Sequence, residues 1–120
     1  MKDFRELKVW EKAHAVTIGI YEATATFPKQ ELYGLTSQLQ RAAVSIATNI
    51  AEGCGKDGDA EFKRFLTIAM GSSSELEYLL LLAHDLGYLT DIKHAELSGQ
   101  LIETRKMLNA LIQKLKAKRN

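Results

Sequence analysis

Carboxylates and histidines three positions apart are the first candidates for chemistry in this sequence. Glu11 and His14 form a Glu-x-x-His pair, and Asp91 and His94 repeat the spacing with an aspartate. Di-iron sites in helical bundles need two Glu-x-x-His pairs and two further carboxylates that point inward. Glu11 falls on the polar side of its helical pattern, and Cys54 has no neighbouring ligand that would complete a zinc site. We therefore expect no metal and no cofactor.

Three other patterns resemble enzyme sites without meeting their requirements. The serines at 72–74 could be combined with His84 and Asp85, but no nucleophile elbow surrounds them, and serines on a helix usually serve packing. The glycine-rich stretch 53–58 lacks the spacing of a phosphate-binding loop and follows a helical pattern rather than a strand. No arginine is followed by a histidine five to seven positions later, the signature of HEPN ribonucleases. We therefore predict that the protein is not an enzyme. The alternative is an enzyme whose site matches none of these known patterns.

Helix-breaking residues divide the chain into four segments. The single proline is Pro28, glycines cluster at 53–58, and Gly87 stands alone. Proline and left-handed glycine end helices, so we expect Gly87 to close one helix and Thr90 to cap the next. Apolar residues recur at spacings of three and four, with no alternation of period two. The sequence predicts one all-α domain over 1–120, an antiparallel up-and-down four-helix bundle with helices at about 4–27, 31–52, 59–86 and 91–118.

The first two predicted helices have more uncharged surface than one bundle core can cover. Apolar residues occupy well over half of the helical circle in 4–27, whereas a helix that faces one core needs an arc of a little over 100°. In 31–52, Arg41 is the only charge from Leu32 to Ala51. We expect both faces to be covered by another subunit or by a polar network. The candidate residues are Trp10, Tyr21, Arg41, Ser45, Thr48 and Glu52.

Positive charge gathers at the end of the chain. The whole sequence has a formal net charge of +1, but residues 50–100 carry −5 and the last twenty residues carry +5. Basic residues near a helix C-terminus are favourable in themselves, because they compensate the helix dipole. Brought together in an oligomer, they would also bind a phosphate backbone without sequence preference. The candidate nucleic-acid contacts are Lys114, Lys116, Lys118 and Arg119.

The amino-acid composition excludes several classes of protein. Apolar residues make up 46% of the sequence and charged residues 26%, the balance of a folded globular domain and not of a disordered chain. The single cysteine excludes an internal disulfide and fits a reducing compartment. Charges of both signs near the N-terminus argue against a signal peptide, and no apolar run reaches the length of a membrane span. We expect a cytoplasmic protein without a membrane partner.

Several stretches, taken in order, resemble one protein family. The chain is similar to the 23S rRNA-intervening-sequence protein family, also called the four-helix-bundle protein family, over nearly its whole length. Two positions differ from the common family pattern, which has two adjacent arginines at residues 40–41 and an arginine near Lys56. The resemblance rests on residues 27–35 (FPKQELYGL), 38–46 (QLQRAAVSI), 48–53 (TNIAEG), 65–72 (FLTIAMGS), 75–77 (ELE) and 86–89 (LGYL).

The resemblance implies more about form than about chemistry. Members of the family look like four-helix bundles that assemble as ring-shaped homopentamers, and no catalytic residues are established to carry over. A relative in diversity-generating retroelements, the accessory variability determinant, acts with a reverse transcriptase and nucleic acid. The resemblance therefore implies a homo-oligomeric accessory protein that binds RNA, DNA or a nucleic-acid enzyme such as a reverse transcriptase. A protein–protein scaffold without nucleic-acid binding is the alternative.

Overall fold

The structure, a computed structural model, describes residues 3–118 and is all-α, as predicted. It measures 48 × 22 × 20 Å along its principal axes. Four α-helices and two short 3₁₀ turns form the regular structure of the described chain, which contains no strand. The elements are η1 (Phe4–Glu6), α1 (Lys8–Thr24), η2 (Lys29–Glu31), α2 (Leu35–Cys54), α3 (Asp59–Asp85) and α4 (Asp91–Lys118).

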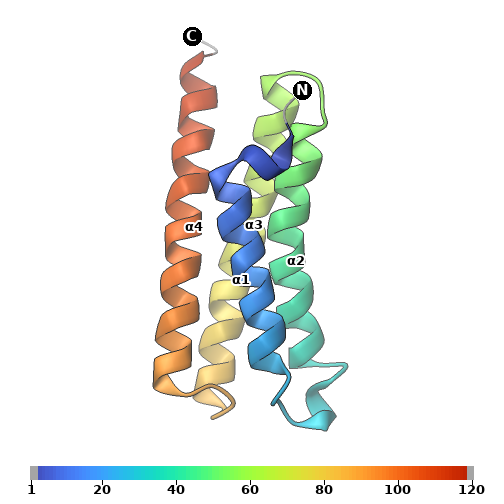
Figure 1. The fold of residues 1–120 in the computed structure, drawn as a ribbon, viewed down its shortest axis with the longest axis vertical. Coiled ribbons are helices and arrows are strands. Elements are labelled where there is room, and N and C mark those ends of the chain that lie inside the picture. Colours follow the sequence, from blue (N-terminus) through green and yellow to red (C-terminus); the bar gives the residue numbers. More distant parts are fainter. Residues whose placement is uncertain (1–2, 119–120) are drawn as a thin grey trace.

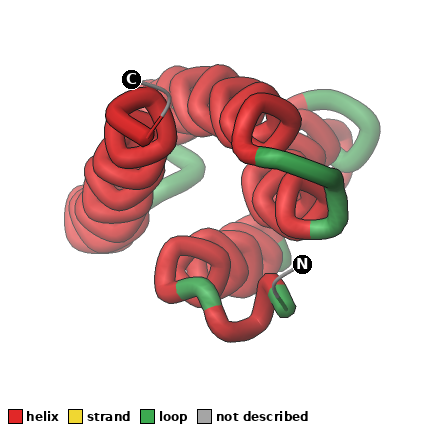
Figure 2. Tube along the Cα trace, turned by 90° about the horizontal axis from the view of Figure 1, so that it is seen from above, coloured by secondary structure: helices red, strands yellow, loops and turns green. Residues whose placement is uncertain are grey.

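The four helices lie side by side along the long axis (Figure 1). Each packs against the helix that follows it in the sequence, and α4 also packs against α1. Within residues 3–118 the diagonal pairs make no close backbone contact, and the view from above shows the helices around a shared centre (Figure 2). The α1–α2 and α3–α4 connections lie at one end, here called the double-loop end. The α2–α3 connection and the last turns of α4 lie at the other, the single-loop end.

The shared centre is a continuous apolar core. Every helix contributes side chains that are at most 1% exposed, and burying such a side chain stabilises the fold by about 1.5–3 kcal/mol. The i, i+3 and i, i+4 spacings of the sequence bring them to one face of each helix. The largest of these fully buried residues are Ile20, Leu39, Ile46, Ile50, Leu66, Leu76, Leu80, Leu97, Leu101 and Leu108.

The first helix is shorter than the expected span of 4–27. The Asp3 carboxylate accepts a hydrogen bond from the Arg5 amide at 3.0 Å, which holds the chain in the separate turn η1. Leu7 is then extended, with φ −84° and ψ 125°, so α1 begins only at Lys8. It ends at Thr24, four residues before Pro28. α1 therefore has 17 residues, whereas α3 has 27 and α4 has 28.

The second helix begins at Leu35 and not near residue 31, because the chain first forms η2. One Glu31 carboxylate oxygen accepts the Leu35 amide at 3.2 Å, so Glu31 caps α2 from outside the helix. The other oxygen accepts the Tyr88 hydroxyl at 3.0 Å. The Tyr88 ring also lies 5.3 Å from the ring of Phe27. Glu31 and Tyr88 thus tie the two connections of the double-loop end together.

The α3–α4 turn is built as predicted. Gly87 has a φ of 81°, and Thr90 caps α4 by accepting the Lys93 amide at 3.0 Å. Across the turn, His84 Nε2 lies 2.6 Å from Asp91 Oδ1, and the rings of His84 and His94 stack at 4.5 Å. The hydrogen bond to Asp91 raises the pKa of His84. The His84–Asp91 contact therefore joins the end of α3 to the start of α4.

The difference in helix length leaves the single-loop end incomplete. At 1.5 Å per residue, α1 is about 26 Å long, whereas α3 and α4 are each about 41 Å long. In Figure 1, α4 continues past the level at which α1 begins. The last turns of α4 and the first turns of α3 therefore lack a fourth helix beside them.

Among the helices of the described chain, α3 is long and apolar enough to pass a length-and-composition test for a membrane span. The core helix of a soluble protein passes the same test. α3 packs along α2 on one side and α4 on the other, which accounts for its apolar composition.

Candidate functional site

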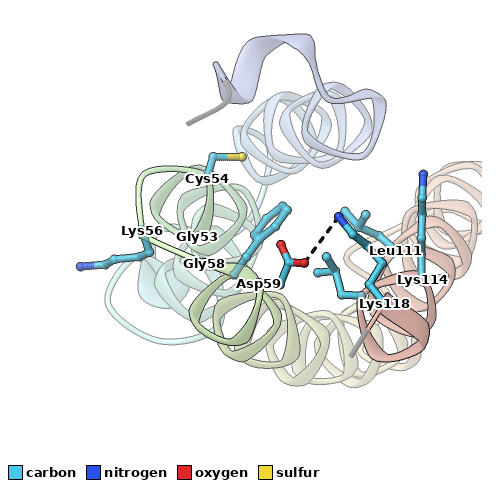
Figure 3. Close-up of a pocket in the computed structure, with 10 residues that line it drawn as sticks. Gly53, Cys54, Lys56, Gly58, Asp59, Leu111, Lys114 and Lys118 are labelled. Atoms are coloured by element: carbon cyan, nitrogen blue, oxygen red, sulfur yellow. Dashed lines mark ion pairs between the residues drawn. The ribbon is translucent and has the colours of Figure 1, made fainter. Parts of the chain in front are cut away.

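A cavity of about 260 Å³ opens at the single-loop end (Figure 3). Its walls come from the end of α2, the α2–α3 loop, the start of α3 and the last turns of α4, and no residue of α1 takes part. It lies at the end of the bundle where α4 extends beyond the start of α1 (Figure 1). The lining residues are Gly53, Cys54, Lys56, Gly58, Asp59, Phe62, Leu111, Lys114, Leu115 and Lys118.

The glycines of the stretch 53–58 shape this cavity. A Cβ on Gly53 would lie 2.9 Å from Phe62 Cδ1 and 3.0 Å from Phe65 Cβ, so only glycine lets α3 approach α2 this closely. Gly58, with a φ of 85°, then reverses the chain into α3. Together they hold the Phe62 ring against α2, on the wall of the cavity.

Lysines surround the mouth of the cavity. Lys118 Nζ lies 3.5 Å from Asp59 Oδ2, the ion pair drawn in Figure 3. Lys56 and Lys114 extend outward to solvent in the same view. Lys56 Nζ lies 5.5 Å above the Phe65 ring. The site therefore offers an aromatic wall and exposed ammonium groups, by which proteins stack bases and bind nucleic-acid backbones, together with one carboxylate that repels phosphate.

The four candidate nucleic-acid contacts are not equivalent. Lys114 and Lys118 line the cavity, and Lys116 is exposed outside it. Lys114 and Lys116 make no hydrogen bond or ion pair within residues 3–118, so their charge is available to a ligand. Arg119 lies outside the described residues.

The six interface candidates lie along a second surface, the α1–α2 face. Tyr21 and Arg41 border a depression of about 420 Å³ together with Ser45 and Thr48. Trp10 and Glu52 border another of about 380 Å³, and Val44 and Thr48 belong to both. The face is thus a continuous, nearly uncharged strip, with Arg41 near one end and Glu52 near the other.

Only Ser45 of these six takes part in a side-chain hydrogen-bond network. Its hydroxyl lies 2.8 Å from that of Ser72 on α3, and Asn49 Nδ2 donates to the Ser45 carbonyl at 2.8 Å. Arg41 and Glu52 are exposed and have no hydrogen bond or ion pair to the side chains of residues 3–118. Trp10 is half-buried, with its ring 4.9 Å from that of His14.

The patterns that resembled enzyme sites come together only in part: His84, Asp85, Asp91 and His94 meet at the α3–α4 turn, whereas the serines contact other residues. Within residues 3–118 no three His, Cys, Asp or Glu side chains gather in a way that could hold a metal ion. The serines at 72–74 serve packing: Ser72 contacts Ser45, Ser73 donates to the Met70 carbonyl at 2.6 Å, and Ser74 accepts from Arg105 at 3.2 Å.

Of the ten residues that line the cavity, the sequence singled out only Lys114 and Lys118 as candidate contacts. Phe62, Asp59 and Lys56 are the charged and aromatic residues that it missed. The sequence did contain a signal for them: Lys56, Asp59 and Phe62 follow one another closely, next to the glycines of 53–58.

Comparison with known proteins places this fold in a family. No curated protein matches the chain at a significant level. A crystal structure of a protein of unknown function from the S23 ribosomal protein family of Bacteroides thetaiotaomicron VPI-5482 is similar, with a TM-score of 0.81 and 25% identity over 88% of this chain and 95% of that one. The sequence profile of the 23S rRNA-intervening sequence protein matches residues 5–110. This chain belongs to the 23S rRNA-intervening sequence protein family.

Proposed function

We propose that this protein is a cytoplasmic, non-enzymatic accessory protein that binds nucleic acid at its single-loop end. The observation that carries the proposal is the group of exposed lysines there, with Lys114 and Lys116 unpaired within the described chain beside an open cavity. Such lysines release counterions when they neutralise phosphates, which gives binding without sequence preference.

The proposal includes assembly of antiparallel four-helix chains into a ring-shaped homopentamer. The α1–α2 face supports a subunit contact, because Tyr21 is 47% exposed and Val44 is 39% exposed in the single chain. Exposed apolar strips rimmed by polar groups are typical of protein interfaces. A ring would bring several single-loop ends together and strengthen their combined field.

Two measurements on the purified protein test this function. Native mass spectrometry should give a mass of five chains at micromolar concentration, and fluorescence anisotropy should detect binding of labelled RNA or DNA at low salt. The affinity should fall steeply as salt is added. A monomer would contradict the assembly, and absence of binding at low salt would contradict the nucleic-acid function.

A protein-binding scaffold is the second candidate function, with a nucleic-acid enzyme such as a reverse transcriptase as one class of partner. The near absence of charge on the α1–α2 face favours it, because interface centres are depleted in charged residues. If the protein forms its oligomer and binds no nucleic acid at low salt, the scaffold function replaces the first proposal.

A further inference from the structure

We propose that the cavity at the single-loop end receives one unpaired base of a single-stranded nucleic acid. The base would stack on Phe62 while the adjoining phosphates meet Lys114 and Lys118. This inference rests on the proposed function and specifies the form of nucleic acid that the site prefers. The lysines of the single-loop end would not by themselves prefer single strands over duplexes, because both forms carry phosphates.

The size and walls of the cavity suit a base. Its volume of about 260 Å³ lies below the roughly 300–1,000 Å³ of pockets that enclose drug-sized ligands. A planar base is smaller than those ligands. Phe62, Leu111 and Leu115 provide apolar walls, and an aromatic ring accepts any base because every base has a π-face.

The charges at the mouth orient such a ligand. The Lys118–Asp59 pair is solvent-exposed, with 60% and 44% of the two side chains accessible, and pairs of this kind hold weakly. Lys118 can therefore exchange the carboxylate for a phosphate. The Asp59 carboxylate then repels phosphate and accepts hydrogen bonds from amino groups, so the base faces inward and the backbone stays at the lysines.

A duplex cannot use this cavity without breaking a base pair. Its bases are already paired and stacked, and extruding one requires unstacking energy that a single strand does not need. The lysines at the rim remain accessible to both forms. The single-loop end should therefore bind single strands more tightly than duplexes that carry the same number of phosphates.

The test compares a short single strand with a blunt-ended duplex of equal phosphate number, at one salt concentration. The single strand carries one 2-aminopurine, whose fluorescence is quenched when it stacks on an aromatic ring. We expect the unmodified protein to bind the single strand more tightly and to quench the probe. Phe62→Leu should weaken single-strand binding about tenfold, abolish the quenching and leave duplex binding unchanged.

Two further variants keep the test decisive. Tyr78→Leu removes an aromatic residue that is 59% exposed on the same helix but outside the cavity, and it should change nothing. Leu111→Trp fills the cavity from α4 and should remove the preference for the single strand, even if Phe62→Leu folds poorly; it is judged by affinity alone, because the new indole ring can itself quench the probe. Circular dichroism checks the folding of all three.

The outcomes separate this inference from the proposed function. Equal affinity for both forms, without quenching in the unmodified protein, would overturn the base site and leave the proposed function standing. Retained quenching in Phe62→Leu together with a retained preference for the single strand in Leu111→Trp would also overturn it. If the unmodified protein binds neither form at low salt, the proposed function itself fails.

Discussion

The two ends of this bundle are built differently. At the double-loop end, Tyr88 donates to Glu31, its ring contacts Phe27, and His84 bonds Asp91 across a turn. At the single-loop end, α1 is missing from the last turns, and the solvent-exposed Lys118–Asp59 pair crosses the mouth of a cavity. One end therefore contributes more to stability, and the other keeps the space and charge that binding needs.

The largest expected effect comes from an aromatic residue at the double-loop end. Phe27 is 9% exposed and packs against Tyr88. Phe27→Ala should lower the free energy of unfolding by about 3 kcal/mol, because it removes a buried ring and leaves a cavity. Phe62→Ala, at the partly exposed opposite end, should cost about 1 kcal/mol. Urea denaturation at one protein concentration measures both, and equal losses would show that the two ends are equally important for stability.

The second effect concerns nucleic-acid binding. Replacing Lys114, Lys116 and Lys118 by Gln should weaken binding at low salt by about tenfold or more and flatten the dependence of log affinity on log salt. The oligomer should stay intact, because the bundle core ends near Leu115. The matched control replaces Lys29 and Lys93 at the double-loop end and should leave affinity unchanged. An equal loss in the control would mean that overall charge, and not this end, attracts the ligand.

A smaller effect should come from the hydrogen bond between the two loops. Tyr88→Phe keeps the ring contact with Phe27 and removes the hydroxyl that Glu31 accepts. It should lower the urea midpoint by less than Phe27→Ala does, since one hydrogen bond contributes less than a buried ring. Tyr33→Phe, at a side chain that is 93% exposed, is the control. A midpoint shift as small as that of the control would mean that the bond contributes nothing.

The smallest effect is a dependence of stability on pH. Asp91 raises the pKa of His84 in the folded chain, so the protonated form of His84 stabilises the fold. This contribution is fully present below the usual histidine pKa of about 6.5 and is lost as pH rises through the higher folded value. Urea denaturation from pH 5 to 9 should show this loss in the unmodified protein. His84→Gln should remove it, whereas His14→Gln should not.

The sequence predicted the number of helices and the α3–α4 turn because both depend on local chemistry. Gly87 takes the left-handed conformation and Thr90 caps the next helix, as their residue types require. It did not predict the length of α1. Phe4 and Phe27 continue the apolar period, yet both lie outside α1, Phe4 in η1 and Phe27 beyond the end of the helix. Periodicity reports burial, and burial persists where the backbone has left the helix.

The candidate site, like the fold, could be predicted from the sequence only in part. The lysines of the last turns stand out by charge alone, and two of them line the cavity. Phe62 does not stand out, because an aromatic residue at helical spacing belongs equally well to a core. The cavity lies where α4 extends beyond α1, and no single segment of the sequence records this difference in helix length.

The hydrogen bond between Glu31 and Tyr88 also bears on the order of folding. It joins residues 57 positions apart, whereas each helix mainly contacts the one next to it in the chain. Local contacts form first, so the α1–α2 and α3–α4 hairpins can arise before this bond exists. Glu31 also caps α2 through the Leu35 amide, a local contact that can form without Tyr88. Hydrogen exchange at the Leu35 amide should therefore differ between the unmodified protein and Tyr88→Phe only if docking of the two hairpins strengthens this cap.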